Sequence, residues 1–280
     1  MNLVALATLG LVGSSALAAA PGRHLLVVCS PGSPGTTAEA QPTMDAFAAA
    51  LAAKAGLPAS ALGAVYDEAE DSGVARLRAK DAAVALVSLP FYLKHEHDLA
   101  LRARLQAVPK GRGEMERWAL VAKKGRVANA ASLDGFTIAS IAGFVPAFVR
   151  GPALGSWGPL PASVRIVPSG AVLSALRRAA SGEPMAVLLD GAQEAALASL
   201  PFASELEVVT RSPPLPAGVV AAVNSRLPPK SWRTIEVALE TLPSDASGTA
   251  ALDAIQITRF ASLDEKALAG ARKAYAEAAR

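Results

Sequence analysis

The chain has 280 residues, of which 52% are hydrophobic and 18% charged, and its formal net charge is +3. This length can form one large domain or two smaller ones, each with an apolar core. Lys and Arg are scattered and form no basic run interleaved with aromatic residues, which argues against nucleic-acid binding. The single cysteine excludes an intramolecular disulfide, so stability must come from apolar burial.

The first 20 residues, MNLVALATLGLVGSSALAAA, carry no charged side chain and end in small residues. They fit the small-x-small pattern at which signal peptidase cuts. We therefore expect residues 1–20 to be a signal peptide, cleaved near Ala18 to Ala20, and the mature protein to be periplasmic. An uncleaved N-terminal anchor is the alternative, because no Lys or Arg precedes the apolar region.

Apolar segments alternate with amphipathic ones along the rest of the chain. This alternation predicts parallel βαβ units and an α/β fold. The strands are expected at 24–29, 61–66, 83–87, 118–122, 136–141, 164–167, 185–189, 206–210 and 219–223. The helices are expected after Thr37, at 71–79, 171–180 and 192–198, and throughout the C-terminal part from Ser231, where 263–279 forms the last helix.

Two stretches of the chain repeat one pattern. Residues 65–92 and 166–193 each contain a short apolar strand, an amphipathic helix ending in Leu-Arg, a second apolar strand and a polar loop. Each follows a strand that opens onto a loop of small residues. The repeat predicts two Rossmann-like α/β lobes, and ligands of such sheets bind at the carboxyl ends of the strands.

The chain is expected to cross between the lobes twice. It leaves the first lobe near residues 118–122 and returns through the stiff segment Ser-Pro-Pro-Leu-Pro at 212–216. The expected division is therefore 21–120 for the first part of lobe 1, 121–212 for lobe 2 and 213–280 for the return to lobe 1. Two linking segments make a two-segment hinge, which suits a protein that closes on a ligand.

Three segments carry a resemblance to a known family. They are AVALVSLPFY at 83–92, SLDGFTIAS at 132–140 and RSPPLPAGVVAAVNSRLP at 211–228. In their order and spacing they resemble the periplasmic phosphate/phosphonate-type solute-binding proteins of ABC transporters. The resemblance implies the bilobed type II periplasmic binding protein fold, no enzymatic activity, no cofactor, a small-molecule ligand and a membrane permease as partner.

One segment departs from the family pattern. Phosphonate binders carry a hydroxyl-rich run after the first strand of the second lobe, whereas this chain has Ser140, Ile141, Ala142, Gly143 and Phe144 there. Fewer hydroxyl donors make an oxyanion costly to bury. We therefore expect a less polar anion site. The alternatives are a carrier of lipids or other apolar molecules with the same fold, and an accessory or sensory binding domain.

The candidate ligand-binding residues follow the strands of both lobes. Each residue type also has an ordinary structural role, as a turn residue, a helix cap or a core aromatic. In the first lobe the candidates are Ser30, Thr36, Thr37, Tyr66, Ser88, Phe91 and Tyr92. In the second lobe they are Ser140, Gly143, Phe144, Ser169, Asp190 and Gln193.

The remaining chemistry-bearing residues form no recognised catalytic or metal motif. His95 and His97 share a face of an extended segment, but a third spaced ligand is missing, so an exposed loop is the preferred interpretation and no metal site is expected. Cys29 follows four apolar residues and is expected to be a buried structural thiol. Glu114, Glu116 and Arg117 are interpreted as a solvated turn.

Overall fold

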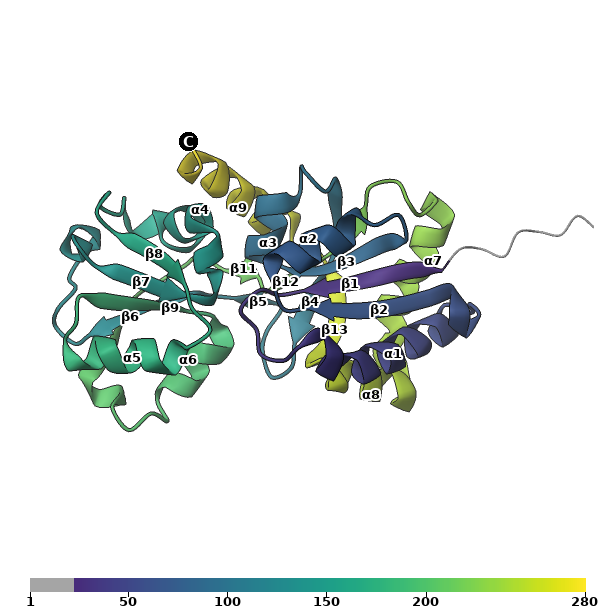
Figure 1. The fold of residues 1–280 in the computed structure, drawn as a ribbon, viewed down its shortest axis with the longest axis horizontal. Coiled ribbons are helices and arrows are strands. Elements are labelled where there is room, and N and C mark those ends of the chain that lie inside the picture. The colour runs from purple at the N-terminus through teal and green to yellow at the C-terminus, as the bar shows by residue number, and fades with distance from the viewer. Residues whose placement is uncertain (1–22) are drawn as a thin grey trace, which may run out of the picture.

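The computed structural model describes residues 23–280, and the predicted signal peptide with its cleavage near Ala18 to Ala20 lies outside the described residues. The chain forms two α/β lobes side by side, each built on one mixed sheet (Figure 1). A two-stranded ribbon joins them. The predicted fold class, two α/β lobes on a two-segment hinge, is therefore confirmed.

The first lobe contains the six-stranded sheet. The strand order is β13-β4-β12-β3-β1-β2, with β1 parallel to β2 and β3 and the other pairs antiparallel. The strands are β1 (His24–Cys29), β2 (Leu62–Asp67), β3 (Ala82–Ser88), β4 (Leu101–Pro109), β12 (Gly218–Val223) and β13 (Ile257–Ser262). The helices are α1 (Thr37–Lys54), α2 (Glu70–Arg78), α3 (Leu89–His95), α7 (Pro229–Thr241) and α8 (Ala246–Ala254).

The second lobe contains the five-stranded sheet, in the order β10-β6-β9-β7-β8. Strand β7 is parallel to β8 and β9, while β6 is antiparallel to β9 and β10. The strands are β6 (Ala119–Lys123), β7 (Thr137–Ser140), β8 (Arg165–Pro168), β9 (Met185–Leu189) and β10 (Leu206–Arg211). The helices are α4 (Pro146–Phe148), α5 (Val172–Ser181) and α6 (Gly191–Leu197).

Two strands of the six-stranded sheet, β4 and β13, were not expected from the sequence, nor were the two short strands of the ribbon. In β4 the apolar Leu101, Ala103 and Leu105 alternate with Arg102 and Arg104, the pattern of a strand with one buried face. Because of its charged residues, this segment was interpreted as a connection between the lobes and not as a strand. Strand β13 interrupts the C-terminal part, which was expected to be helical throughout, because it pairs with β4 along the edge of the sheet.

The hinge is a short antiparallel ribbon. Strand β5 (Met115–Glu116) pairs with β11 (Leu215–Pro216), so the outgoing and returning segments lie side by side. Ser212 fixes the entry to this ribbon, because its hydroxyl accepts from the backbone N–H of Trp118 at 2.9 Å. The lobe boundaries at residues 120 and 212 stay predictions; β6 itself starts to pair in the five-stranded sheet at Ala119.

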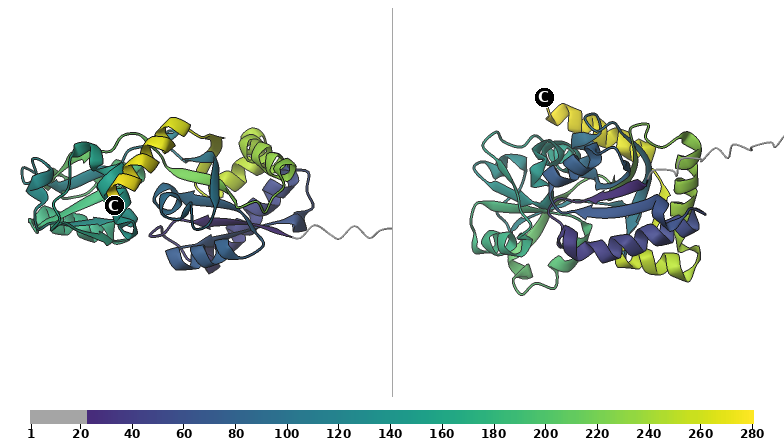
Figure 2. Two further views of the ribbon diagram at one scale, coloured as in Figure 1. Left: turned by 90° about the horizontal axis from the view of Figure 1, so that it is seen from above. Right: turned by 45° about the vertical axis from the view of Figure 1, so that its right-hand side comes forward.

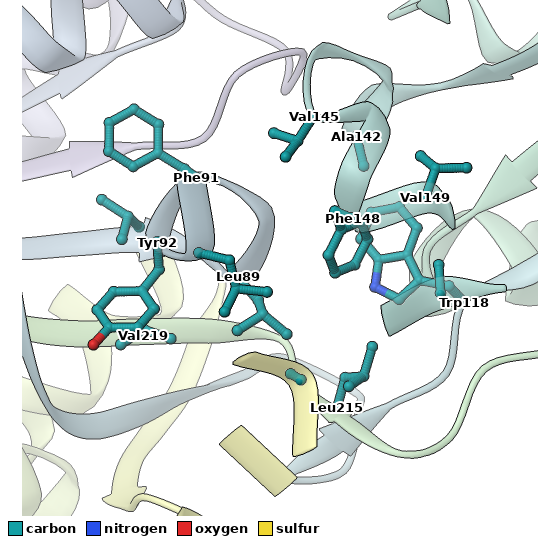
Figure 3. Close-up of a cluster of buried hydrophobic side chains, with 14 of the residues drawn as sticks. Leu89, Phe91, Tyr92, Trp118, Ala142, Val145, Phe148, Val149, Leu215 and Val219 are labelled. Carbon is teal, nitrogen blue, oxygen red and sulfur yellow. The ribbon is translucent and has the colours of Figure 1, made fainter. Parts of the chain in front are cut away.

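A continuous apolar cluster joins the two lobes on the hinge side (Figure 3). Leu89 and Val219 come from the first lobe, Phe148 from the second, and Trp118 and Leu215 from the two hinge segments. The rings of Trp118 and Phe148 meet edge to face, with centroids 5.2 Å apart. The lobes are thus fastened by a shared core as well as by the chain itself.

Helix α9 (Glu265–Ala278) is a third connection between the lobes (Figure 2). It follows β13 of the first lobe, and its Arg272 contacts Tyr92 Oη at 2.6 Å and Glu96 Oε2 at 2.9 Å there. Its other side packs against the second lobe, where Gly151 approaches Ala274 so closely that an added Cβ would lie 2.3 Å from the Ala274 carbonyl oxygen.

The close approach at Gly151 predicts a specific packing defect. Gly151→Ala pushes α9 away from the second lobe and is expected to lower the free energy of unfolding by about 1–3 kcal/mol, as overpacking does elsewhere. Gly270→Ala is the matched control, because an added Cβ meets no atom within 4 Å. That control should stabilise the exposed helix by up to about 1 kcal/mol. Urea denaturation measures both, and equal effects of the two variants would contradict the docking of α9.

Candidate functional site

A cavity of about 260 Å³ lies between the two lobes. The first lobe lines it with the ends of β1 and β3 and the loops that follow, including Ser30 and Ser88. The second lobe contributes Ile141 and Phe144 from the 3₁₀ turn after β7, together with Asp190 after β9. The cavity therefore lies at the carboxyl ends of parallel strands of both sheets, where ligands of such sheets bind.

The hinge supplies the buried charged part of the cavity wall. Glu116 on β5 is only 8% exposed, and its Oε2 accepts from Arg112 Nη1 at 2.8 Å. The backbone N–H of Gly191, at the start of α6, lies near this carboxylate and favours its charged form. The sequence had indicated a solvated turn here, and the structure corrects this: the antiparallel pairing of β5 with β11 turns Glu116 inward.

The pKa of Glu116 is raised to about 7. Burial of the carboxylate is the largest cause, since removal from water penalises the charged form, and the negative charge of Asp190 adds to the effect. The Arg112 guanidinium and the Gly191 N–H act in the opposite direction. Glu116 therefore changes its protonation near neutral pH, as functional carboxylates often do.

The loop after β1 closes one side of the cavity against the second lobe. Gly32 has φ +82°, a left-handed conformation that favours glycine, and a Cβ there would lie 3.3 Å from Ile141 Cβ. Tyr66 Oη holds this loop by donating toward the carbonyls of Ser33 at 3.3 Å and Pro34 at 3.4 Å. Beyond the loop lies a shallow groove of about 700 Å³, so the loop separates the inner cavity from an outer groove.

A second contact between the lobes lies at α3. The ammonium group of Lys94 donates to the carbonyl of Phe144 at 3.3 Å and lies 5.8 Å from the centre of its ring. The same ammonium group pairs with Glu70 Oε1 at 2.6 Å. The first lobe therefore holds Phe144, which lines the cavity, in place.

The predicted site residues of the first lobe separate into two groups. Ser30 and Ser88 line the cavity, and the Ser30 hydroxyl accepts from Ser33 Oγ at 2.9 Å. Thr36 caps α1, and Thr37 donates its hydroxyl to Glu68 at 2.8 Å, so both hydroxyls serve local structure. Tyr66 supports the loop from behind.

Phe91 and Tyr92 belong to the core rather than to the cavity wall. Both side chains are fully buried, Phe91 against the ring of His95 and Tyr92 against Arg272 of α9. Their helix α3 starts directly at the end of β3, and the two rings extend from it in different directions (Figure 3). Pro90 of the same segment lines the cavity instead.

The predicted residues of the second lobe also separate. Phe144 and Asp190 line the cavity, whereas Gln193 lines the outer groove and forms a capping box with Asp190. The hydroxyl of Ser140 is fully buried and donates to the Leu188 carbonyl at 2.8 Å. Ser169 donates its backbone N–H to the Ser140 carbonyl, and the lining of the cavity does not include it.

Gly143 is explained by packing. A Cβ at this position would lie 2.1 Å from the Val167 carbonyl oxygen, so only glycine allows the 3₁₀ turn to lie against β8. The Ser140 hydroxyl is already hydrogen-bonded to the Leu188 carbonyl. The turn therefore lines the cavity with backbone and apolar groups. It presents no side-chain hydroxyl to the cavity.

The histidine pair forms no metal site within residues 23–280. His95 Nε2 lies 2.6 Å from Glu70 Oε1, whereas the His97 side chain is 92% exposed. No group of three or more His, Cys, Asp or Glu side chains in this range is placed to hold a metal ion. Cys29 is buried as expected, and burial raises the pKa of its thiol. Likewise, no helix of the described range is long and apolar enough to span a membrane.

Among the lining residues that the sequence analysis missed are three of the outgoing hinge segment, namely Arg112, Glu116 and Trp118. All three lie on the outgoing hinge segment rather than at the carboxyl end of a parallel strand. The sequence offered only an indirect indication of these residues. In a protein whose two lobes close on a ligand, the segments that link the lobes border the cleft. Glu116 stands between Met115 and Arg117, and no motif there distinguishes it from a surface carboxylate.

No protein-family model matches the chain, and no curated protein matches it in sequence. Solved structures do. XAC2383 from Xanthomonas citri, bound to chloride ion, superimposes with a TM-score of 0.72 at 15% identity over 92% of this chain and 99% of that one. The binding protein component of an ABC phosphonate transporter from Pseudomonas aeruginosa gives 0.65 at 13% identity, over 92% and 87% of the two chains.

A third structure agrees with these. PhnD1 from Prochlorococcus marinus (MIT 9301), in complex with methylphosphonate, gives a TM-score of 0.63 at 13% identity over 92% of this chain and 98% of that one. The chain has the type II periplasmic binding protein fold. The resemblance noted in the three sequence segments is thereby confirmed at the level of the fold.

The buried carboxylate predicts how stability varies with pH. Between pH 4.5 and 7 the unfolded chain has released the Glu116 proton while the folded chain still holds it. Folding is therefore disfavoured progressively as pH rises through this window, by at most roughly 3 kcal/mol. Glu116→Gln should remove this loss. The free energy of unfolding of the variant, relative to that of the wild type, should therefore increase as pH rises toward 7. Urea denaturation across the window measures the difference, and a difference independent of pH would contradict the assignment.

Proposed function

We propose that the protein is an exported solute-binding protein that captures a small ligand between its lobes and delivers it to the permease of an ABC transporter. The observation that carries the proposal is the cavity of about 260 Å³ at the strand ends of both sheets, bordered by the hinge ribbon. The phosphonate-transporter component and PhnD1 support it as proteins of the same fold. A periplasmic location follows from the expected signal peptide.

Hinge closure is the work that such a protein performs. A ligand that contacts both walls binds the closed state more tightly than the open one and shifts the population toward it. Contacts of Gly32 with Ile141 and of Lys94 with Phe144 already bridge the lobes at the two sides of the cavity.

The cavity favours a small solute over a lipid. Its volume of about 260 Å³ lies below the usual range for drug-sized pockets. The site also differs from a phosphonate site, because the Ser140 hydroxyl is already committed to Leu188. We therefore propose a phosphonate-binder-like protein with a less polar anion site and without enzymatic or cofactor chemistry.

An apolar-ligand carrier is the second candidate, and one observation favours it. Much of the cavity wall is hydrocarbon, with Val28, Leu86, Ile141 and Phe144 among the lining residues. The apolar molecule would be small, because a long acyl chain exceeds the cavity. Native mass spectrometry of the purified protein separates the two candidates, since an apolar molecule tends to stay bound.

Filling the cavity should abolish ligand binding without unfolding the protein. Ser88→Phe places a ring in the cavity from a side chain for which the structure records no hydrogen bond. Calorimetric titration with transport substrates should show binding to the wild type and at least a hundredfold loss in the variant. Ser247→Phe, on exposed α8 of the first lobe, is the control and should bind as the wild type does. Unchanged affinity in Ser88→Phe would overturn the assignment of the cavity.

A further inference from the structure

Within residues 23–280, the two lobes meet at three places around the cavity, and these contacts differ in kind. On the hinge side, β5 pairs with β11, and the start of α6 lies against Glu116. At α3, the ammonium group of Lys94 donates to the carbonyl of Phe144 at 3.3 Å. The third contact is made by the loop 30–35, which follows β1 on the side of the first lobe that faces the second (Figure 1).

The contact at the loop is a van der Waals contact. A Cβ added to Gly32 would lie 3.3 Å from Ile141 Cβ, and one added to Gly170 would lie 3.6 Å from the Gly32 carbonyl oxygen. In the described part of the chain, the hydrogen bonds of the loop all stay within the first lobe. Dispersion contacts are individually weak. Of the three contacts, the one at the loop is therefore the easiest to break.

The loop is also the thin part of the cavity wall. Ser33 of the loop and Ile141 of the second lobe line both the inner cavity of about 260 Å³ and the outer groove of about 700 Å³. One residue from each lobe thus separates the two spaces. A displacement of the loop away from Ile141 connects the cavity to the groove, and through the groove to solvent.

Within residues 23–280, one hydroxyl group tethers the loop to the rest of its own lobe. Tyr66, buried on β2, donates from Oη toward the carbonyls of Ser33 at 3.3 Å and Pro34 at 3.4 Å. Both distances are long for an O–H donor, and a single proton is shared between two acceptors. The bond from Ser33 Oγ to Ser30 Oγ, at 2.9 Å, lies inside the loop and moves with it. A weak hydrogen bond therefore holds the loop in its present position.

We propose that the loop 30–35 is the gate of the cavity, that it closes against Ile141, and that Tyr66 is the positioning residue that holds it shut. A solute enters from the outer groove between Ser33 and Ile141, while the hinge ribbon and the contact of Lys94 with Phe144 stay formed. The inference rests on the proposed function, because it names the route by which a solute reaches the same cavity.

The experiment measures how fast a thiol inside the cavity reacts. Ser88→Cys places the thiol in the cavity lining, and the probe is methyl methanethiosulfonate, a small uncharged reagent. The thiolate attacks the reagent's divalent sulfur, a mixed disulfide forms and methanesulfinate leaves, so the mass of the protein reports the reaction. The native thiol of Cys29 is buried and donates to the Ala69 carbonyl at 3.6 Å, at the start of α2. Its reaction in the wild type therefore reports unfolding.

Two variants in the Ser88→Cys background open the gate. Tyr66→Phe keeps the ring but removes the tether, and Ile141→Ala shortens the side chain against which the loop closes. Each should speed the reaction of the introduced thiol by about fivefold or more, because the open population grows. Tyr275→Phe on α9 and Leu173→Ala, which lines only the outer groove, are the matched controls and should leave the rate unchanged.

Lys94→Met in the same background separates a gate from a parting of the whole lobes. It removes the hydrogen bond to Phe144, so the rate should change by less than about twofold if the solute passes the loop. A larger rise than in Ile141→Ala would overturn the gate.

The other outcomes are equally decisive. Rates that do not respond to Tyr66→Phe and Ile141→Ala, or that rise in parallel with the reaction of Cys29, would also overturn the gate. The proposed function is judged separately, because it fails only if Ser88→Phe leaves every titration unchanged.

Discussion

The structure depends on one apolar core that runs across the junction of its two lobes. One buried cluster contains Leu89 and Val219 of the first lobe, Trp118 and Leu215 of the hinge segments, and Phe148 of the second lobe. Because apolar burial has no directional requirement, such a cluster fastens the hinge side while leaving the opposite side open to polar chemistry. Helix α9 extends the same fastening, since it begins after β13 of the first lobe and ends against the second (Figure 2).

This fastening explains why the buried charges lie where they do. The hinge ribbon must enter the junction, and β5 carries Glu116 into it, where burial raises the pKa of the carboxylate to about 7. Arg112 and the start of α6 offset only part of that cost. Strand β5 therefore joins the two lobes and also borders the cavity between them.

The two lobes share one topology, which the internal repeat of the sequence anticipated. The order β3-β1-β2 in the first sheet corresponds to β9-β7-β8 in the second, and in both the next strand, β12 or β6, is antiparallel and follows a hinge crossing. The apolar runs and their spacing are local properties of the chain, so they could be recognised without coordinates. Strand β4 was missed because Arg102 and Arg104 alternate with its apolar residues, and the edge strand β13 because Thr258 and Arg259 interrupt its short apolar run.

The sequence by itself determined the α/β class, the two lobes and the neighbourhood of the cleft. Strand ends and turns depend on residues that are close together in the chain, so they can be recognised without a structure. It placed Ser30, Ser88, Phe144 and Asp190, all of which line the cavity. Only the tertiary structure decided that Phe91 and Tyr92 are core side chains and that Glu116 is buried. It also decided that the Ser140 hydroxyl donates to the Leu188 carbonyl. The physical reason is that burial and pKa depend on which distant segments pack together, and the pairing of β5 with β11 joins residues about a hundred positions apart.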